Sequence, residues 1–208
     1  MKSDTVILWR SFFDSGVVEY HKALLEQLNP DYDIVKIDSH TLDKYESWYN
    51  NDVALYQWFK RTNPSYTRYI VLEWDVRCFI PLKDFFGDKW FSDFAVPCLK
   101  KRGIESDWHW FNHGVQLPEK YKISEVGVAP MACMILSHEC ISEISNYYFK
   151  NIEELKDLFC ELRIGTLANY LGFSPCEISN EAKENITCGP INLNNMNRKS
   201  IYHWVKHL

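Results

Sequence analysis

Two carboxylates, Glu73 and Asp75, flank Trp74 directly after the apolar run Tyr-Ile-Val-Leu at 69–72. A run rich in β-branched and aromatic residues is typical of an interior strand, and in open α/β sheets ligands bind outside the carboxyl ends of the strands. Residues two apart in a strand face the same way, so we expect Glu73 and Asp75 to point together at one cation and Trp74 to point away. The sequence therefore predicts a metal-diphosphate site, and the alternative is an acidic surface turn after a core strand.

Two residues near the end of the sequence, His203 and Lys206, could complete such a site. Magnesium and manganese prefer carboxylate oxygen, sometimes with one imidazole, and as Lewis acids they neutralise a leaving diphosphate. Asp75 would supply the carboxylate and His203 the imidazole, whereas Lys206 would add positive charge beside the diphosphate. The alternative is a loosely ordered chain end.

A further pair of acids, Glu161 and Asp157, lies on a helix predicted over 152–171. If a group is transferred to an acceptor hydroxyl, a carboxylate can take the proton of that hydroxyl, and these two residues, one turn apart, compete for that role. Alternatively, Glu161 and Arg163 belong to an exposed helix face. No separate base is needed if the leaving phosphate takes the proton, so the stereochemistry of the transfer stays open.

Aromatic residues make up 15% of the chain, including eight tryptophans, and they are dense between 81 and 121. Flat rings offer stacking faces for a sugar or a nucleobase. Trp108, Trp110, His109 and His113 could form the wall of an acceptor site, whereas a tryptophan-rich hydrophobic cluster would give the same composition.

The elements that must position these residues follow from the hydrophobic pattern. Strands are predicted at 5–9, 32–38 and 69–72, and amphipathic helices at 19–28 and 52–61. This alternation of strands and helices favours a parallel sheet covered by helices.

The second part of the chain has a weaker pattern. The apolar run 126–136 contains Pro130 and is predicted to be an edge or bent strand. Helices are predicted at 137–149 and 152–171, and Gly172 is a typical stop signal for the latter.

Composition excludes several classes of protein. A chain of 208 residues fits one domain, 1–208. With a net charge of −5, the chain lacks the basic footprint of a nucleic-acid-binding protein.

Seven cysteines without a C-x-x-C pair indicate a reduced intracellular chain, so we expect a cytoplasmic protein. No apolar run reaches the roughly 18 residues of a membrane span. Neither G-x-G-x-x-G nor a P-loop occurs, which disfavours a dehydrogenase and a P-loop kinase.

The strand-helix-strand-helix-strand half that ends in acid-x-Asp, followed by an aromatic half and a late histidine, resembles the GT-A fold glycosyltransferases. The segment 70–76, Ile-Val-Leu-Glu-Trp-Asp-Val, is similar to the GT-A-like domain of chlorovirus enzymes that glycosylate the major capsid protein. Glu73 stands where the D-x-D motif of the family has Asp, which leaves open whether it contacts the metal or instead the sugar or ribose.

The resemblance implies a single α/β domain of GT-A type, with a mostly parallel central sheet flanked by helices and a smaller mixed sheet on the acceptor side. The nucleotide-binding half would span about 1–78 and the acceptor-binding half about 79–208. Asp75 would bind the metal directly, with His203 as a second ligand. The nucleotide-sugar would be bound by Trp9, Arg10, Ser11, Asp38, Glu73, Trp74 and Lys206.

The expected function is thus a metal-dependent transfer of a hexosyl or deoxyhexosyl group. The donor would be a nucleoside diphosphate sugar, UDP- or GDP-linked, the cofactor Mn²⁺ or Mg²⁺, and the acceptor a glycan or glycoprotein, such as a viral capsid glycan in the host cytoplasm. A non-catalytic carbohydrate- or protein-binding module is the main alternative. A nucleotidyltransferase or phosphohydrolase would normally require more acidic ligands or a glycine-rich basic loop.

Overall fold

The structure of the protein is a computed structural model with side chains. It describes residues 4–11, 16–38, 48–104, 107–112, 117–129, 131–180, 186–188 and 201–203, with only the backbone at 38, 186–188, 202 and 203.

A six-stranded mixed sheet with the order β2-β1-β3-β8-β5-β9 forms the centre of the molecule. Its strands are β1 (Thr5–Ser11), β2 (Asp33–Asp38), β3 (Arg68–Glu73), β5 (Phe94–Val96), β8 (Cys133–Ser137) and β9 (Cys176–Glu177). β1 pairs in parallel with both β2 and β3, while β8 runs antiparallel to both β3 and β5. The carboxyl ends of β1, β2 and β3 therefore meet at one edge, as the alternating sequence pattern predicts.

Both faces of the inner strands β1, β3 and β8 are buried, which explains why these strands are mostly apolar. Side chains along each strand alternate between two core clusters: Val6, Leu8, Tyr69 and Val71 belong to the first, and Ile7, Trp9, Ile70 and Leu72 to the second. The position of a residue in its strand thus decides which face it reaches.

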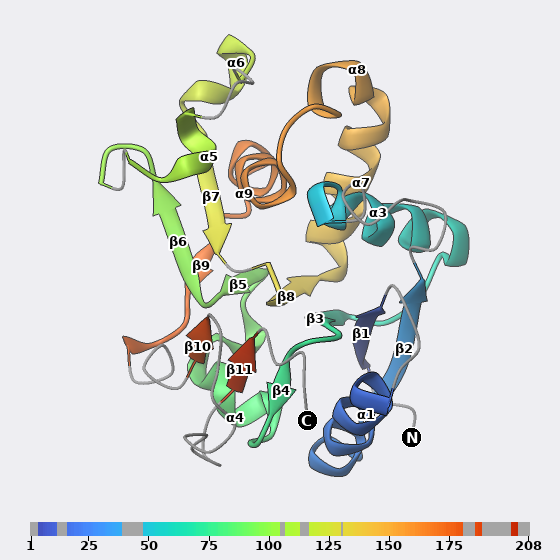
Figure 1. Cartoon of the computed structure of the whole chain (residues 1–208). Coiled ribbons are helices and arrows are strands. Elements are labelled where there is room, and N and C mark those ends of the chain that lie inside the picture. Colours follow the sequence, from blue (N-terminus) through green and yellow to red (C-terminus); the bar gives the residue numbers. More distant parts are fainter. Residues whose placement is uncertain are drawn as a thin grey trace.

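Helices cover the two faces separately (Figure 1). The first cluster is covered by α3 (Asn51–Thr62), α7 (His138–Lys150) and α9 (Cys160–Tyr170), and the second by α1 (Gly16–Leu28) and α4 (Leu82–Phe86). Local signals set the helix ends: Ser137 Oγ accepts a hydrogen bond from the backbone N–H of Cys140, and Asn63 ends α3 with a left-handed φ of 42°. None of the described helices is long and apolar enough to cross a membrane.

Two smaller sheets complete the described part of the chain. β6 (Cys98–Lys101) pairs antiparallel with β7 (Val126–Ala129), and β7 also packs against α9. The other sheet has the order β10-β11-β4, from β10 (Ile186–Cys188), β11 (Ile201–His203) and β4 (Arg77–Cys78). The remaining short elements are α5 (His109–Asn112), α6 (Glu119–Lys122), α8 (Ile152–Leu155) and the 3₁₀ helix η1 (Gly87–Phe91).

Two element predictions were wrong. The run 126–136 is not one edge strand but two strands, β7 and β8, and β8 lies inside the main sheet between β3 and β5. The segment 152–171 is not one helix, because α8 ends at Leu155 and α9 begins at Cys160. The predicted α/β class, with a mostly parallel sheet flanked by helices and a smaller sheet beside it, is confirmed.

Candidate functional site

The polar groups at the carboxyl ends of β1 and β3 form the core of the candidate site. Arg10 and Glu73 are neighbours in the parallel register, and both face the side covered by α3, α7 and α9. Arg10 Nη1 donates to Glu73 Oε1 at 3.4 Å, and the side-chain amide of Asn51, the first residue of α3, donates to the same oxygen. Glu73 is therefore held by a cation and an amide at a sheet edge.

Arg10 is only 1% exposed, so its guanidinium is a buried charge and not a solvated surface charge. Burial lowers the pKa of its guanidinium, and the charge of Glu73 acts in the opposite direction. Trp9 faces the other side and lies in the second core cluster. It is 1% exposed and therefore a core aromatic.

Asp75 differs from Glu73 in its position. β3 ends at Glu73, so Trp74 and Asp75 form a turn and no longer alternate as strand residues. The argument that Glu73 and Asp75 point together because they are two apart in a strand was therefore wrong. Asp75 is nonetheless 4% exposed, which makes it a buried carboxylate and not a residue of an exposed acidic turn.

A histidine of α1 forms a hydrogen bond with this turn. His21 is 2% exposed and its Nδ1 lies 3.1 Å from the backbone carbonyl of Trp74. A carbonyl can only accept, so we assign the proton to Nδ1. Burial lowers the pKa of His21, and the positive charge of Arg77 lowers it further, whereas the hydrogen bond to the carbonyl of Trp74 raises it. His21 is thus a neutral hydrogen-bond donor that fixes the middle of the acidic motif.

The end of the chain reaches the same place through backbone pairing. β11 runs antiparallel to β4, with Ile201 opposite Cys78 and Tyr202 opposite Arg77. Extending this register by one residue places the backbone of His203 beside Val76, next to Asp75. The side chain of His203 is not described, and Lys206 lies outside the described residues, so their predicted roles remain predictions. Within the described ranges, no group of three or more His, Cys, Asp or Glu side chains could hold a metal ion.

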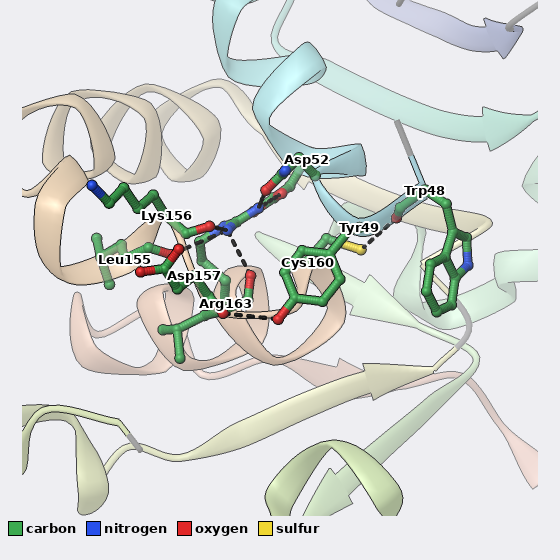
Figure 2. A network of polar contacts seen from close by, with 10 residues as sticks. Trp48, Tyr49, Asp52, Leu155, Lys156, Asp157, Cys160 and Arg163 are labelled. Carbon is green, nitrogen blue, oxygen red and sulfur yellow. Dashed lines mark hydrogen bonds and ion pairs between the residues drawn. The ribbon is translucent and has the colours of Figure 1, made fainter. Parts of the chain in front are cut away.

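A buried ion pair lies beside this site, between α3 and α9 (Figure 2). Arg163 Nε donates to Asp52 Oδ2 at 2.8 Å and Nη2 donates to Oδ1, and neither side chain is exposed. Burial disfavours the charged guanidinium, but the charge and hydrogen bonds of Asp52 more than offset this and raise the pKa of Arg163. The expectation that Arg163 could belong to an exposed helix face was wrong.

The two predicted base candidates occupy different environments. Glu161 is half-buried in the first turn of α9, and its Oε1 accepts from the backbone N–H of Met131 at 3.0 Å. Asp157 is exposed and lies between α8 and α9, not one turn earlier on the same helix. Its backbone carbonyl accepts from the hydroxyl of Tyr49 at 2.8 Å. Both acids therefore lie close to the junction of α3 and α9.

The predicted acceptor residues also separate in the structure. Trp110 stacks on Phe159 with ring centroids 3.8 Å apart, and Trp48, which is 45% exposed, contacts both rings. Trp108 instead packs on Phe111 of the core. His113 lies outside the described residues. Trp110 thus belongs to a partly exposed aromatic cluster, whereas Trp108 is a packing residue of the hydrophobic cluster that the sequence also allowed.

The remaining predicted nucleoside-binding positions lie at strand ends. Ser11 is fully buried and pairs in parallel register with Asp38, of which only the backbone is described. Sequence reasoning missed Asn51 and Asp52 as site residues because it used 52–61 only as a helix. The run Asn50-Asn51-Asp52 before an apolar helix was a signal, since such residues favour helix starts and can turn their side chains toward neighbouring groups.

A hollow of about 650 Å³ lies elsewhere, at the amino-terminal end of β3, whereas the candidate site lies at the carboxyl end of this strand. It is lined by Thr67, which precedes β3, and by Ser137, with which β8 ends. Ligands of open α/β sheets bind at the carboxyl ends of the parallel strands, so we place the candidate site at Glu73 and not in this hollow.

The fold is similar to that of solved glycosyltransferases, as the sequence resemblance implied. It is similar to the crystal structure of a glycosyltransferase involved in the glycosylation of the major capsid of PBCV-1, with a TM-score of 0.56 and 11% identity, over 98% of this chain and 94% of that chain. It is also similar to an active-site mutant of LgtC, with a TM-score of 0.51 and 8% identity, over 95% of this chain and 86% of that chain. No protein-family profile and no curated protein matches the sequence significantly. At such low identity the likeness concerns the fold.

Proposed function

We propose that the chain is a metal-dependent glycosyltransferase that moves a hexosyl or deoxyhexosyl group from a UDP- or GDP-linked sugar to a glycan or glycoprotein acceptor. One observation carries the proposal: a buried carboxylate, Asp75, follows β3 at the carboxyl edge of three parallel strands. The fold shared with solved glycosyltransferases supports it.

Asp75 has the chemistry of a ligand for a divalent cation. Asp75 offers carboxylate oxygen, which Mn²⁺ and Mg²⁺ prefer, and the β4–β11 pairing brings the backbone of His203 close to it. A cation held there would neutralise the negative charge that develops on the leaving diphosphate. Lys206, close behind His203 in sequence, would add a further positive charge.

Glu73 takes a different role in this proposal. Its Oε1 already accepts from the cationic Arg10 and from the amide of Asn51, so this oxygen is less available to a metal. We therefore place Glu73 against a hydroxyl of the donor, on the sugar or the ribose, and keep Asp75 as the metal ligand. The strand ends at Ser11 and Asp38, which are paired in register, would bind the nucleoside.

The acceptor would bind where α3 meets α9. Trp110, which belongs to the partly exposed aromatic cluster, offers a ring for stacking on a sugar face. Glu161 is the better candidate for the general base than Asp157, because the N–H of Met131 fixes its carboxylate at the start of α9. A capsid glycan is the first acceptor to test, since one similar structure belongs to an enzyme of capsid glycosylation.

The test is thermal unfolding with Mn²⁺, with UDP or GDP, and with both together. A ligand at 100 times its Kd stabilises by about 2.7 kcal/mol, which raises Tm by roughly 5–10 °C for a chain of this size. We expect this shift only with metal and nucleotide together, and we expect Asp75→Asn to abolish it. Asp31→Asn, an exposed acid in the turn before β2, is the matched control.

The outcomes separate the candidate functions. No shift with any combination would refute the glycosyltransferase proposal. Stabilisation by glycans alone, without metal or nucleotide, would instead identify a carbohydrate-binding module. An unchanged Mn²⁺ response in Asp75→Asn would remove Asp75 from the metal site.

A further inference from the structure

Arg163 is a fully buried arginine whose donors all have partners. Besides its two bonds to Asp52, Nη2 donates to Asn50 Oδ1 at 3.1 Å, and Nη1 donates to the backbone carbonyls of Leu155 at 3.1 Å and Leu158 at 2.6 Å. Its side chain has no exposed surface, so it cannot touch a ligand. Any effect of Arg163 on the candidate site must pass through the groups that it holds.

Those groups belong to the first turn of α3. Asn50 stands at the N-cap position, yet its side chain makes no capping hydrogen bond and accepts from Arg163 instead. Asp52 is the second residue of the helix, and its two carboxylate oxygens are fixed by the planar fork of the guanidinium. Asn51 lies between these two anchored residues, and its amide holds Glu73.

Further contacts attach the same segment to the region before and within α9. Tyr49 donates to the carbonyl of Asp157, and Cys160 Sγ donates to the carbonyl of Trp48 at 3.5 Å. Figure 2 shows these contacts around the central contact of Arg163 with Asp52. Residues 48–52 are therefore connected at several points to residues 155–163.

An ion pair is not needed merely to join two helices. A buried ion pair is weak support for stability, because the loss of hydration offsets much of the attraction, and apolar side chains of similar volume often stabilise as well. What a guanidinium fork adds is a fixed direction at each bond. The pair is thus better suited to setting the orientation of the α3 terminus than to stabilising the contact.

We propose that Arg163 is a positioning residue for the donor end of the site. Through Asp52 and Asn50 it fixes the first turn of α3, so that Asn51 holds Glu73 against Arg10. The hydrogen bond from Asn51 to Glu73 therefore depends on α9, the helix that also contains Glu161. The consequence for donor binding rests on the proposed function, whereas the structural dependence of Asn51 on Arg163 does not.

The experiment uses the double variant Asp52→Leu/Arg163→Met, which replaces the pair with apolar side chains, together with Asn51→Ala and the triple variant. Binding is measured with UDP-glucose, UDP-galactose, GDP-mannose and GDP-fucose, each with Mn²⁺, and the tightest of the four is followed. We expect the double variant to bind it about tenfold more weakly, the loss typical of one hydrogen bond to a charged group. Because Arg163 acts through Asn51, the triple variant should be no weaker than Asn51→Ala.

A second readout needs no ligand. The side-chain amide of Asn51, assigned by its disappearance in Asn51→Ala, should give resolved and slowly exchanging NMR signals in the wild type. In the double variant these signals should move to the positions of a solvent-exposed amide. Arg163→Lys, which keeps the charge but loses the fork, should shift them in the same direction and serves if the double variant does not fold.

Lys122→Met is the matched control, because Lys122 also pairs with a carboxylate, that of Glu119, but both of these side chains are exposed. It should change neither readout. Unchanged Asn51 signals in both the double variant and Arg163→Lys would overturn the proposal, as would a triple variant whose loss is the product of the separate losses. If the wild type binds none of the four nucleotide sugars, the proposed function fails, and the Asn51 signals alone decide the positioning role.

Discussion

Removal of one partner of the Asp52–Arg163 pair should be far more destabilising than removal of both. Arg163→Met leaves the carboxylate of Asp52 at zero exposure without its two charge-assisted hydrogen bonds, and it deprives the carbonyls of Leu155 and Leu158 of their donor. Breaking a buried pair in this way costs about 3–5 kcal/mol. For a chain of this size, that loss lowers Tm by roughly 6–20 °C.

The assay is urea unfolding at pH 7, followed by tryptophan fluorescence and by circular dichroism so that two-state behaviour is checked. The double variant Asp52→Leu/Arg163→Met should recover most of the lost stability, because no uncompensated charge stays buried. Lys122→Met is again the control, and since Lys122 is 51% exposed and its partner Glu119 86% exposed it should lose at most about 1 kcal/mol.

Two results would contradict this reasoning. A loss below about 1 kcal/mol in Arg163→Met would mean that Asp52 reaches water or another partner. If the double variant is as unstable as Arg163→Met, the loss of stability comes from the loss of the ion pair itself and not from the unpaired charge of Asp52.

Two further predictions concern packing and pH. Gly165→Ala should destabilise by about 1–3 kcal/mol, because its Cβ would lie 2.3 Å from the carbonyl oxygen of Val126; Gly103→Ala, where the added Cβ has open space, should change urea unfolding little. His21 has a lowered pKa in the folded state, so the unfolded chain binds more protons and stability should fall as pH decreases below about 6.5, by at most about 1.4 kcal/mol per pH unit. His21→Gln should flatten this dependence, which is measured by urea unfolding between pH 7 and 5. If the free energy of unfolding changes equally with pH in the wild type and in His21→Gln, His21 is not a buried neutral histidine.

The sequence predicted the strands that hold the site because their burial on two faces makes them apolar throughout. β1 and β3 could be recognised from 5–9 and 69–72 alone, and α3 ends at Thr62, directly before its αL cap Asn63. The orientation of Asp75 could not be predicted, because it depends on β3 ending at Glu73, one residue after the apolar run.

The break between α8 and α9 was also beyond sequence reasoning. No glycine or proline marks it, and the apolar pattern continues through Leu158 and Phe159. The carbonyls that a continuous helix would pair internally accept from Arg163 instead, including those of Leu155 and Lys156. The break is therefore accompanied by contacts from a side chain seven or eight residues further along the chain, and the apolar pattern does not report them.

The pairing of β11 with β4 has a consequence for the order in which the protein folds. β4 lies directly behind the acidic motif, yet its partner strand comes from the far end of the described chain. Closing so long a loop has an entropic cost, whereas β1, β2 and β3 pair over much shorter separations. We therefore expect the sheet to form before the strand that contains His203 pairs with β4, so that the proposed metal site would be completed in a late step of folding.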